Sequence, residues 1–141
     1  MTPKERAEKS AAAMWSGDGA SSWVGMELIS VDEGTSEMGL TVEKHHTNGH
    51  GMCHGGITFT LADSAFAFAC NSRNQATVAQ HNSISYLAPA MIGDRLTARA
   101  HEVHLQGRSG IYDVKVTNQN NTLIAEFRGH SRSIKGTLFE E

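Results

Sequence analysis

The chain of 141 residues is 39% hydrophobic, which suits one domain with its own core and leaves too little length for two. With 12 lysines and arginines against 15 aspartates and glutamates, the formal net charge is −3, so we expect no basic surface for nucleic acid. The amino terminus lacks the apolar stretch of a secretory signal, and the densest apolar run, residues 65–70, is too short to cross a bilayer. We therefore expect a cytoplasmic protein without a membrane partner, in which Cys53 and Cys70 are thiols.

The first third of the chain predicts a helix and then a hairpin. Thr2 and Glu5 have the spacing of a capping box with proline at the first helical position, so we expect an amino-terminal helix over residues 1–17. Residues 26–32 and 35–44 alternate partially between apolar and polar side chains on either side of a glycine-containing turn. This pattern indicates two antiparallel strands.

Residues 55–71, which follow a polar loop, are rich in alanine and phenylalanine and apolar on nearly every side, as is typical of a buried helix. Four further strands are expected, at residues 77–88, 95–105, 111–117 and 122–134. Antiparallel strands that cannot leave such a helix exposed favour an α+β fold, in which a six-stranded antiparallel sheet wraps around a central apolar helix. No repeat or linker divides the chain, so we expect residues 1–141 to form a single domain.

Asp63 is the only acidic residue of the apolar helix, and an ionised carboxylate is costly there unless it is paired or solvated by a pocket. At about 100° per residue, the small or polar side chains fall along one stripe, formed by Gly56, Thr60, Asp63 and Ala67. That stripe could border a cavity. The alternative is a carboxylate that neighbouring backbone amides or the Thr60 and Ser64 hydroxyls satisfy.

The loop before this helix brings side-chain donors and glycines, from Asn48 to Gly56, to a helix amino terminus. Free N–H groups at such an end carry positive partial charge and suit an anion or an oxyanion. Gly55 and Gly56 would let a substrate carbonyl approach the backbone closely. The alternative is that His54, Gly55 and Gly56 form only a tight entry turn.

Three other kinds of chemistry are conceivable in these segments. A metal could be drawn from His45, His46, His50, Cys53 and His54, but no second ligand pair has the spacing of a structural zinc site. Cys53 could act as a nucleophile, although its adjacency to His54 in sequence does not put a base against the thiol. The segment around Ser109 lacks the spacing and the following helix of a nucleophile elbow.

Several motifs together resemble one known family. They are Asn48-Gly49-His50, Cys53-His54-Gly55-Gly56, the segments at residues 61–67 and 69–72, and the segments at residues 84–89, 93–98, 112–114 and 127–129. In this combination they are similar to the hotdog-fold acyl-CoA thioesterases of phenylacetate degradation, the PaaI type. The likeness covers most of the chain after Gly25. The chain departs from it at Ser85-Tyr86, where family members often carry Asp-Phe or Asn-Phe, and at Ala88, where they carry arginine.

The resemblance implies hydrolysis of arylacetyl-CoA thioesters, especially ring-hydroxylated phenylacetyl-CoA, to the free acid and CoA, with no metal and no cofactor. The departures at Tyr86 and Ala88 would affect acyl preference. Two other functions suit the same pocket. A non-catalytic acyl-CoA sensor would bind without cleaving, but this chain has no second domain to supply an output. A hotdog hydratase or dehydratase would need a histidine paired with an acid.

Thioester hydrolysis requires a stabilised oxyanion and an activated oxygen nucleophile. We assign the Gly55 N–H to the carbonyl oxygen. Asp63 then either deprotonates water or attacks directly to form an anhydride. Asn48 would hold the water or the carbonyl, and His54 would brace the loop. The turn of Gly107, Arg108 and Ser109 offers amides and a guanidinium for a CoA phosphate, with an ordinary hairpin turn as the alternative.

Helix geometry also predicts a shared site. Gly55 and Asp63 are ~12 Å apart along one helix axis, at 1.5 Å per residue, and cannot both reach one thioester carbon. If both act within hydrogen-bond reach of the reacting group, they come from different chains that pack across a two-fold axis. We therefore expect an obligate homodimer with two shared sites, or a homotetramer built as a dimer of dimers.

Overall fold

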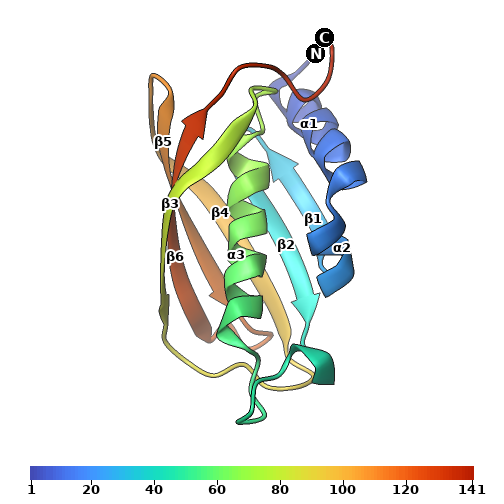
Figure 1. Ribbon diagram of the computed structural model, residues 1–141, viewed down its shortest axis with the longest axis vertical. Coiled ribbons are helices and arrows are strands. Elements are labelled where there is room, and N and C mark those ends of the chain that lie inside the picture. The colour runs from blue at the N-terminus through green and yellow to red at the C-terminus, as the bar shows by residue number, and fades with distance from the viewer.

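The structure, a computed structural model, describes residues 1–141 (Figure 1). Its helices are α1 (Pro3–Gly17), α2 (Gly19–Val24), the short 3₁₀ helix η1 (Lys44–His46) and α3 (Gly55–Cys70). Its strands are β1 (Glu27–Asp32), β2 (Thr35–Thr41), β3 (Thr77–Tyr86), β4 (Arg95–Gln106), β5 (Ser109–Thr117) and β6 (Leu123–Ser133). All neighbouring strands pair antiparallel, in the order β1-β2-β4-β5-β6-β3. The expected α+β class and the six-stranded sheet are confirmed.

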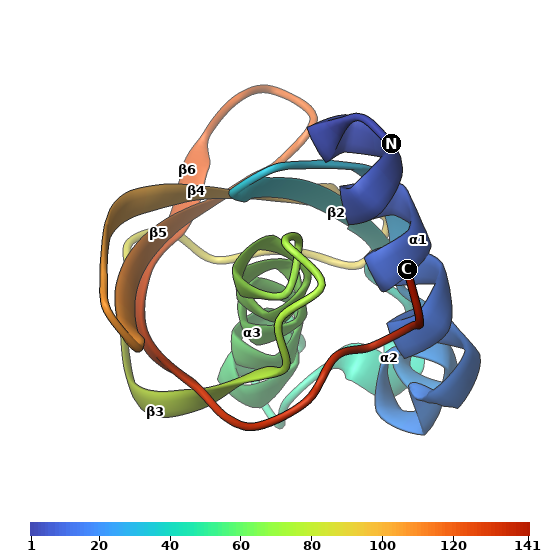
Figure 2. The ribbon, with the colours of Figure 1, turned by 90° about the horizontal axis from the view of Figure 1, so that it is seen from above.

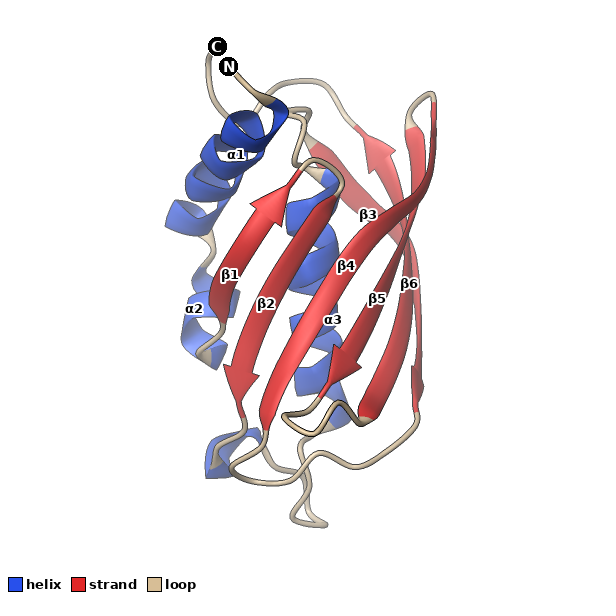
Figure 3. Ribbon diagram, turned by 180° about the vertical axis from the view of Figure 1, so that it is seen from behind, coloured by secondary structure: helices blue, strands red, loops and turns tan.

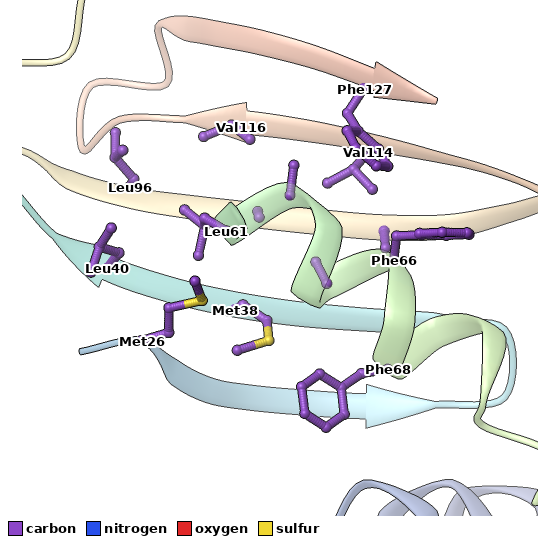
Figure 4. Packing of buried hydrophobic residues seen from close by; sticks show 14 of the residues in the cluster. Met26, Met38, Leu40, Leu61, Phe66, Phe68, Leu96, Val114, Val116 and Phe127 are labelled. Carbon is purple, nitrogen blue, oxygen red and sulfur yellow. The ribbon is translucent and has the colours of Figure 1, made fainter. Parts of the chain in front are cut away.

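The sheet curls around α3, which occupies its concave side (Figure 2). Register shifts interrupt four of the strand pairs, and such bulges bend a strand and increase its twist. Apolar side chains from the helix and the sheet meet between them (Figure 4). The largest buried ones in this core include Met38, Leu40, Leu61, Phe66, Phe68, Leu96, Val114 and Phe127.

Phe66 shows how closely α3 and the sheet approach one another. Its ring lies 5.6 Å from the ring of Tyr112 and 5.8 Å from that of Phe127, measured between centroids. It also lies directly over Gly129 of β6, where an added Cβ atom would be only 2.8 Å from the Phe66 ring. Only glycine leaves enough room for the aromatic ring at this point of the sheet.

The two edges of the sheet differ. At one edge, α1 packs against β1, and α1 and α2 lie beside this strand (Figure 3). Lys4 Nζ also donates a hydrogen bond to the backbone carbonyl of Val31 at 3.2 Å. At the other edge, seven of the ten residues of β3 are exposed, and no further strand pairs with it. Four of the six residues of β1 are also exposed, so the two edges differ in the helices beside β1 and not in the exposure of their residues.

The amino-terminal helix, the hairpin, the central helix and the four later strands were all predicted, with ends that differ by a few residues. The sequence missed α2, a six-residue helix that the Asp18 side chain caps and that ends at Gly25, where φ is 93°. β2 ends at Thr41 and not at residue 44, because Glu43 caps the short helix η1 that follows. A helix of six residues is too short to leave a hydrophobic period in the sequence.

Candidate active site

Asp63 lies half-buried on α3 and has one hydrogen-bond partner. Asn82 Nδ2, on β3, donates to Asp63 Oδ1 at 3.0 Å. Burial raises the pKa of Asp63, and the hydrogen bond from Asn82 opposes part of that rise. The alternative in which Thr60 and Ser64 satisfy the carboxylate is wrong, because Thr60 donates to a backbone carbonyl of α3 and Ser64 pairs with a serine of α2.

Asn82 is the residue of this site that the sequence reasoning missed. It pairs with Gly129 of β6 and is half-buried, as is Ile84, whereas Ser83 and Ser85 are exposed. The side chains of a strand alternate between the two faces of the sheet, so this pattern puts Asn82 on the face toward α3. The alternation of Asn82 and Ile84 with two serines was the signal in the sequence that could have indicated an inward-facing Asn82. It does not say which helix residue lies opposite.

The loop before α3 is organised around Asn48. Asn48 Oδ1 accepts hydrogen bonds from the backbone N–H groups of His50 and Met52, at 2.9 Å and 3.2 Å. The Asn48 backbone N–H donates to the Met52 carbonyl at 2.7 Å. The side-chain Nδ2 has no acceptor within the chain, so it remains a free donor beside the pocket described below.

Gly55 begins α3 with a free backbone N–H. His54 is the N-cap, and its Nδ1 accepts a hydrogen bond from the Gly56 N–H at 2.8 Å. The Gly55 N–H finds no acceptor, because the first amides of a helix have none within it. The Tyr86 hydroxyl donates to the Gly55 carbonyl at 2.8 Å, and a Cβ atom on Gly55 would lie 3.1 Å from the Tyr86 ring. A side chain at position 55 would therefore press against the Tyr86 ring, which would have to shift by a few tenths of an ångström.

A pocket of about 430 Å³ opens beside this helix amino terminus. Asn48 and Gly55 line it on one side, and Tyr86, Ala88 and Ile124 give it a largely apolar wall. Asp63 is not among its lining residues. One chain therefore brings Asn48, His54, Gly55 and Gly56 together and leaves Asp63 on a different part of α3.

Cys53 is buried, and burial raises the pKa of its thiol. Its sulfur lies 3.6 Å from the Thr58 hydroxyl and 3.7 Å from the backbone carbonyl of His54. Neither group is a base that could deprotonate a thiol. A nucleophilic Cys53 is therefore not supported by its surroundings.

Of the histidine-rich loop, only Glu43, His45 and His46 bring possible metal-ligand atoms together. Both ring nitrogens of His46 are engaged: Nδ1 accepts a hydrogen bond from the Glu43 backbone N–H at 2.9 Å, and Nε2 lies 2.7 Å from the carbonyl oxygen of Val24. A carbonyl only accepts, so Nε2 is the protonated nitrogen. No lone pair of His46 is left for a metal. His50, Cys53 and His54 lie outside this group.

The turn of Gly107, Arg108 and Ser109 lies at the other end of the sheet. Ser109 pairs with Arg132 near the end of β6, close to the start of β3 and the carboxyl end of α3. The Arg108 guanidinium donates to the Ser133 carbonyl, at 3.1 Å and 3.3 Å. The length of α3 alone separates this turn from Gly55 by roughly 20 Å, so the two cannot contact the same end of a ligand within one chain.

Comparisons with known proteins identify the family of this chain. The sequence profile described as Thioesterase superfamily matches residues 50–125. The chain is 43% identical to the acyl-coenzyme A thioesterase PaaI of Escherichia coli over 136 residues, which cover 96% of this chain and 97% of that one. The solved structure of the E. coli PaaI protein from the phenylacetic acid degradation operon superposes with a TM-score of 0.95 at 42% identity, covering 96% of this chain and 99% of that chain.

A more distant structure, a thioesterase protein of Streptococcus pneumoniae solved with coenzyme A, has a TM-score of 0.76 at 26% identity and covers 80% of this chain and 88% of that chain. None of the helices has both the length and the apolar character of a membrane span. The profile matches more than half of the chain, and the identity to PaaI extends over nearly all of it. This chain therefore belongs to the thioesterase superfamily, with the hotdog fold of its PaaI-type members.

Proposed function

We propose that this thioesterase hydrolyses arylacetyl-CoA, with (hydroxy)phenylacetyl-CoA as the preferred substrate, at two sites shared between the subunits of a homodimer. The single observation that carries the proposal is the division of the site residues along α3. Asn48 and the free Gly55 N–H border an apolar pocket, and Asp63 lies outside that pocket on the same helix. A second chain is needed to bring a carboxylate to a thioester held at Gly55.

The open edge at β3 supports this dimer. An edge strand with unpaired N–H and C=O groups is a template for pairing with another chain. Antiparallel pairing of β3 with its copy about a two-fold axis would also set the two α3 helices antiparallel. With that axis near Phe59, midway between Gly55 and Asp63, each Gly55 would face the Asp63 of the partner chain. Each dimer would hold two equivalent sites.

We further propose that two dimers assemble into a tetramer. The end of β4 carries Val103 and Leu105, which are 46% and 42% exposed although both are apolar. Such side chains favour contact with another protein surface. The experiment below needs only the dimer, so tetramer formation is tested separately by light scattering.

The mechanism follows from the groups at the site. The thioester carbonyl oxygen accepts a hydrogen bond from the Gly55 N–H, at the positive end of the helix dipole. Asp63 from the other chain takes the proton of a water molecule whose oxygen attacks the carbonyl carbon, or attacks that carbon itself to give an anhydride that water then cleaves. The carbon–sulfur bond breaks, and CoA leaves as the thiol. Asn48 Nδ2 is a free donor for the carbonyl or the water.

The proposed preference for an aromatic acyl group is inferred from the residues that line the pocket. Tyr86, Ala88 and Ile124 offer an aromatic face and small or branched apolar groups, which suit an aromatic ring. The E. coli relative belongs to the phenylacetic acid degradation operon. The Tyr86 hydroxyl is already bound to the Gly55 carbonyl, so it presents mainly its ring to the acyl group.

The CoA part of the substrate would extend away from the pocket. The Gly107 turn of the same chain lies roughly 20 Å from Gly55, and we propose that Arg108 of another subunit, together with Gly107 and Ser109, contacts a CoA phosphate. The antiparallel arrangement of the two helices favours this, because the carboxyl half of one α3 lies alongside and beyond the amino end of the other.

Turnover of phenylacetyl-CoA, followed with a chromogenic thiol reagent, tests the proposal. Wild type should release thiol faster from phenylacetyl-CoA than from acetyl-CoA or hexanoyl-CoA. Asp63→Asn and Asn48→Ala should each lower kcat, the former by about 10³-fold, because a general base contributes roughly 10²–10⁴-fold. After subunit exchange, a mixture of the two inactive variants should regain activity, since each mixed dimer has one intact site.

Two results would contradict the proposal. Near-normal turnover by Asp63→Asn would remove the carboxylate from the reaction, and tight binding of phenylacetyl-CoA by wild type without thiol release would favour the acyl-CoA sensor. A mixture that stays inactive although mass spectrometry shows mixed dimers would contradict the shared site alone.

A further inference from the structure

The carboxylate of Asp63 is held at one oxygen only. Its Oδ1 accepts the hydrogen bond from Asn82 Nδ2 at 3.0 Å, and Oδ2 has no donor within the chain. A carboxylate that accepted several hydrogen bonds on both oxygens would be a stable anion with little tendency to take a proton. Asp63 instead combines a fixed orientation with one free oxygen, which is the arrangement that proton transfer or nucleophilic attack requires.

The strand that carries Asn82 is irregular just before it. The β3 and β6 pairing shifts register between Ala79 and His81, and regular pairing resumes at Asn82 with Gly129. Bulges of this kind re-aim the side chains that follow them. Because Gly129 has no side chain, the Asn82 amide meets no side chain from its cross-strand partner, and it extends toward α3 and Asp63.

The carbonyl oxygen of the Asn82 side-chain amide does not contribute a hydrogen bond to the fold. Asn82 Oδ1 is buried and has no hydrogen-bond donor. A buried carbonyl without a partner destabilises a protein, and native structures rarely contain one. An asparagine that served only to stabilise the fold would have both ends satisfied. The single hydrogen bond that the Asn82 side chain makes is with Asp63.

We propose that Asn82 is a positioning residue for Asp63, which fixes the orientation of the carboxylate and keeps it ionised against the effect of burial. This inference rests on the proposed function, in which Asp63 acts on the thioester. Asn82 acts through Asp63 and does not touch the substrate. Its amide opposes the desolvation that favours the neutral acid, because a hydrogen bond to an anion stabilises the charged form.

The experiment compares Asn82→Leu and Asn82→Asp with wild type. Leucine has nearly the same size and no donor, and aspartate has the same shape but adds a second negative charge. In Asn82→Leu we expect kcat to fall by roughly 10–100-fold, as expected for a misoriented catalytic group, with KM within about 3-fold of wild type. The acidic limb of the pH profile of kcat/KM should move up by about one pH unit, and further in Asn82→Asp, because the loss of the hydrogen bond raises the pKa of Asp63.

A direct titration of the carboxyl carbon of Asp63 by NMR should give the same order, with the pKa lowest in wild type and highest in Asn82→Asp. Asn120→Leu is the matched control, because it makes the same substitution at an exposed asparagine in the turn between β5 and β6. It should leave kcat, the acidic limb and the titration unchanged. The Asn82→Leu variant should stay folded, since it also removes the unsatisfied buried carbonyl. If it does not fold, Asn82→Asp carries the same test.

An unmoved acidic limb and an unmoved Asp63 titration in Asn82→Leu or Asn82→Asp would overturn the inference, as would equal shifts in Asn120→Leu. These outcomes are distinct from failure of the proposed function. If Asp63→Asn is inactive and the Asn82 variants behave like wild type, only the role of Asn82 is wrong. If Asp63→Asn is active, the assignment of Asp63 itself is wrong.

Discussion

The two sides of α3 have opposite characters. On the side toward the middle of the sheet, Leu61 and Ala65 are 0% exposed and Phe66 is 1% exposed, and all three belong to the hydrophobic core. On the face that carries Asp63, which reaches Asn82 of the edge strand β3, Thr60, Asp63 and Ala67 are half-buried, and the carboxylate has a single hydrogen-bond partner. One helix therefore separates two tasks by face. The packed side stabilises the fold, and the open side keeps a reactive group available at some cost in stability.

The largest effect on stability is expected on the packed side, from Phe66→Ala. Removing this ring leaves a cavity against Tyr112, Phe127 and Gly129 that the close-packed core cannot fill. The free energy of unfolding should fall by about 3–5 kcal/mol, measured by urea denaturation at a fixed protein concentration. Thr60→Ala on the open side is the control and should lose less than about 1 kcal/mol. Similar losses in both variants would mean that the two faces do not differ.

A smaller effect of opposite sign is expected on the open side, from Asp63→Asn. Burial raises the pKa of Asp63 in the folded protein above its unfolded value, so folding favours the protonated form. The stability that this provides is fully present below the unfolded pKa and is lost as the pH rises through the folded pKa. Asparagine resembles the protonated acid at every pH.

At pH 8 we therefore expect Asp63→Asn to be more stable than wild type, by on the order of 1 kcal/mol, a figure kept small because water partly screens a half-buried charge. The difference should shrink toward pH 4. Thermal unfolding of both proteins at these two pH values measures it. A variant that is less stable than wild type at pH 8 would show that Asp63 supports the fold.

The smallest effect, no change at all, is expected from chelators. The chemistry is assigned to α3 and its preceding amides, and both nitrogens of His46 are already engaged. Thiol release should be unaffected by a strong chelator after prolonged incubation. Loss of activity that zinc restores would show that the reaction depends on a metal, with Glu43 and His45 of the loop as its candidate ligands.

The helix and its stripe could be predicted from the sequence, because helical periodicity is local. Asp63 stood out as the only acid in an apolar segment, and its open side follows from a spacing of three or four residues. Asn82 could not be predicted in the same way. It contacts Asp63 from a strand 19 residues away, and the bulge after Ala79 sets which side chains of that strand face the helix. Register and bulges depend on pairing between distant segments, which no local pattern encodes.

The distance between the Arg108 turn and Gly55 was missed for a related reason. The sequence indicated two suitable turns, but only the sheet order sets them at opposite ends of the molecule. Likewise, Tyr86 was noted as a departure from the family, but its hydrogen bond to the Gly55 carbonyl depends on how β3 passes the start of α3.

The unequal edges of the sheet have a consequence for how far the protein can polymerise. Because α1 packs against β1 and Lys4 engages one of its carbonyls, β1 is a poorer template for another strand than β3. In the terms of polymer chemistry, a sheet that can be extended at only one edge is a monofunctional unit. Joining two such units at β3 consumes the only reactive end of each, so strand addition terminates at the pair and cannot continue into a fibre.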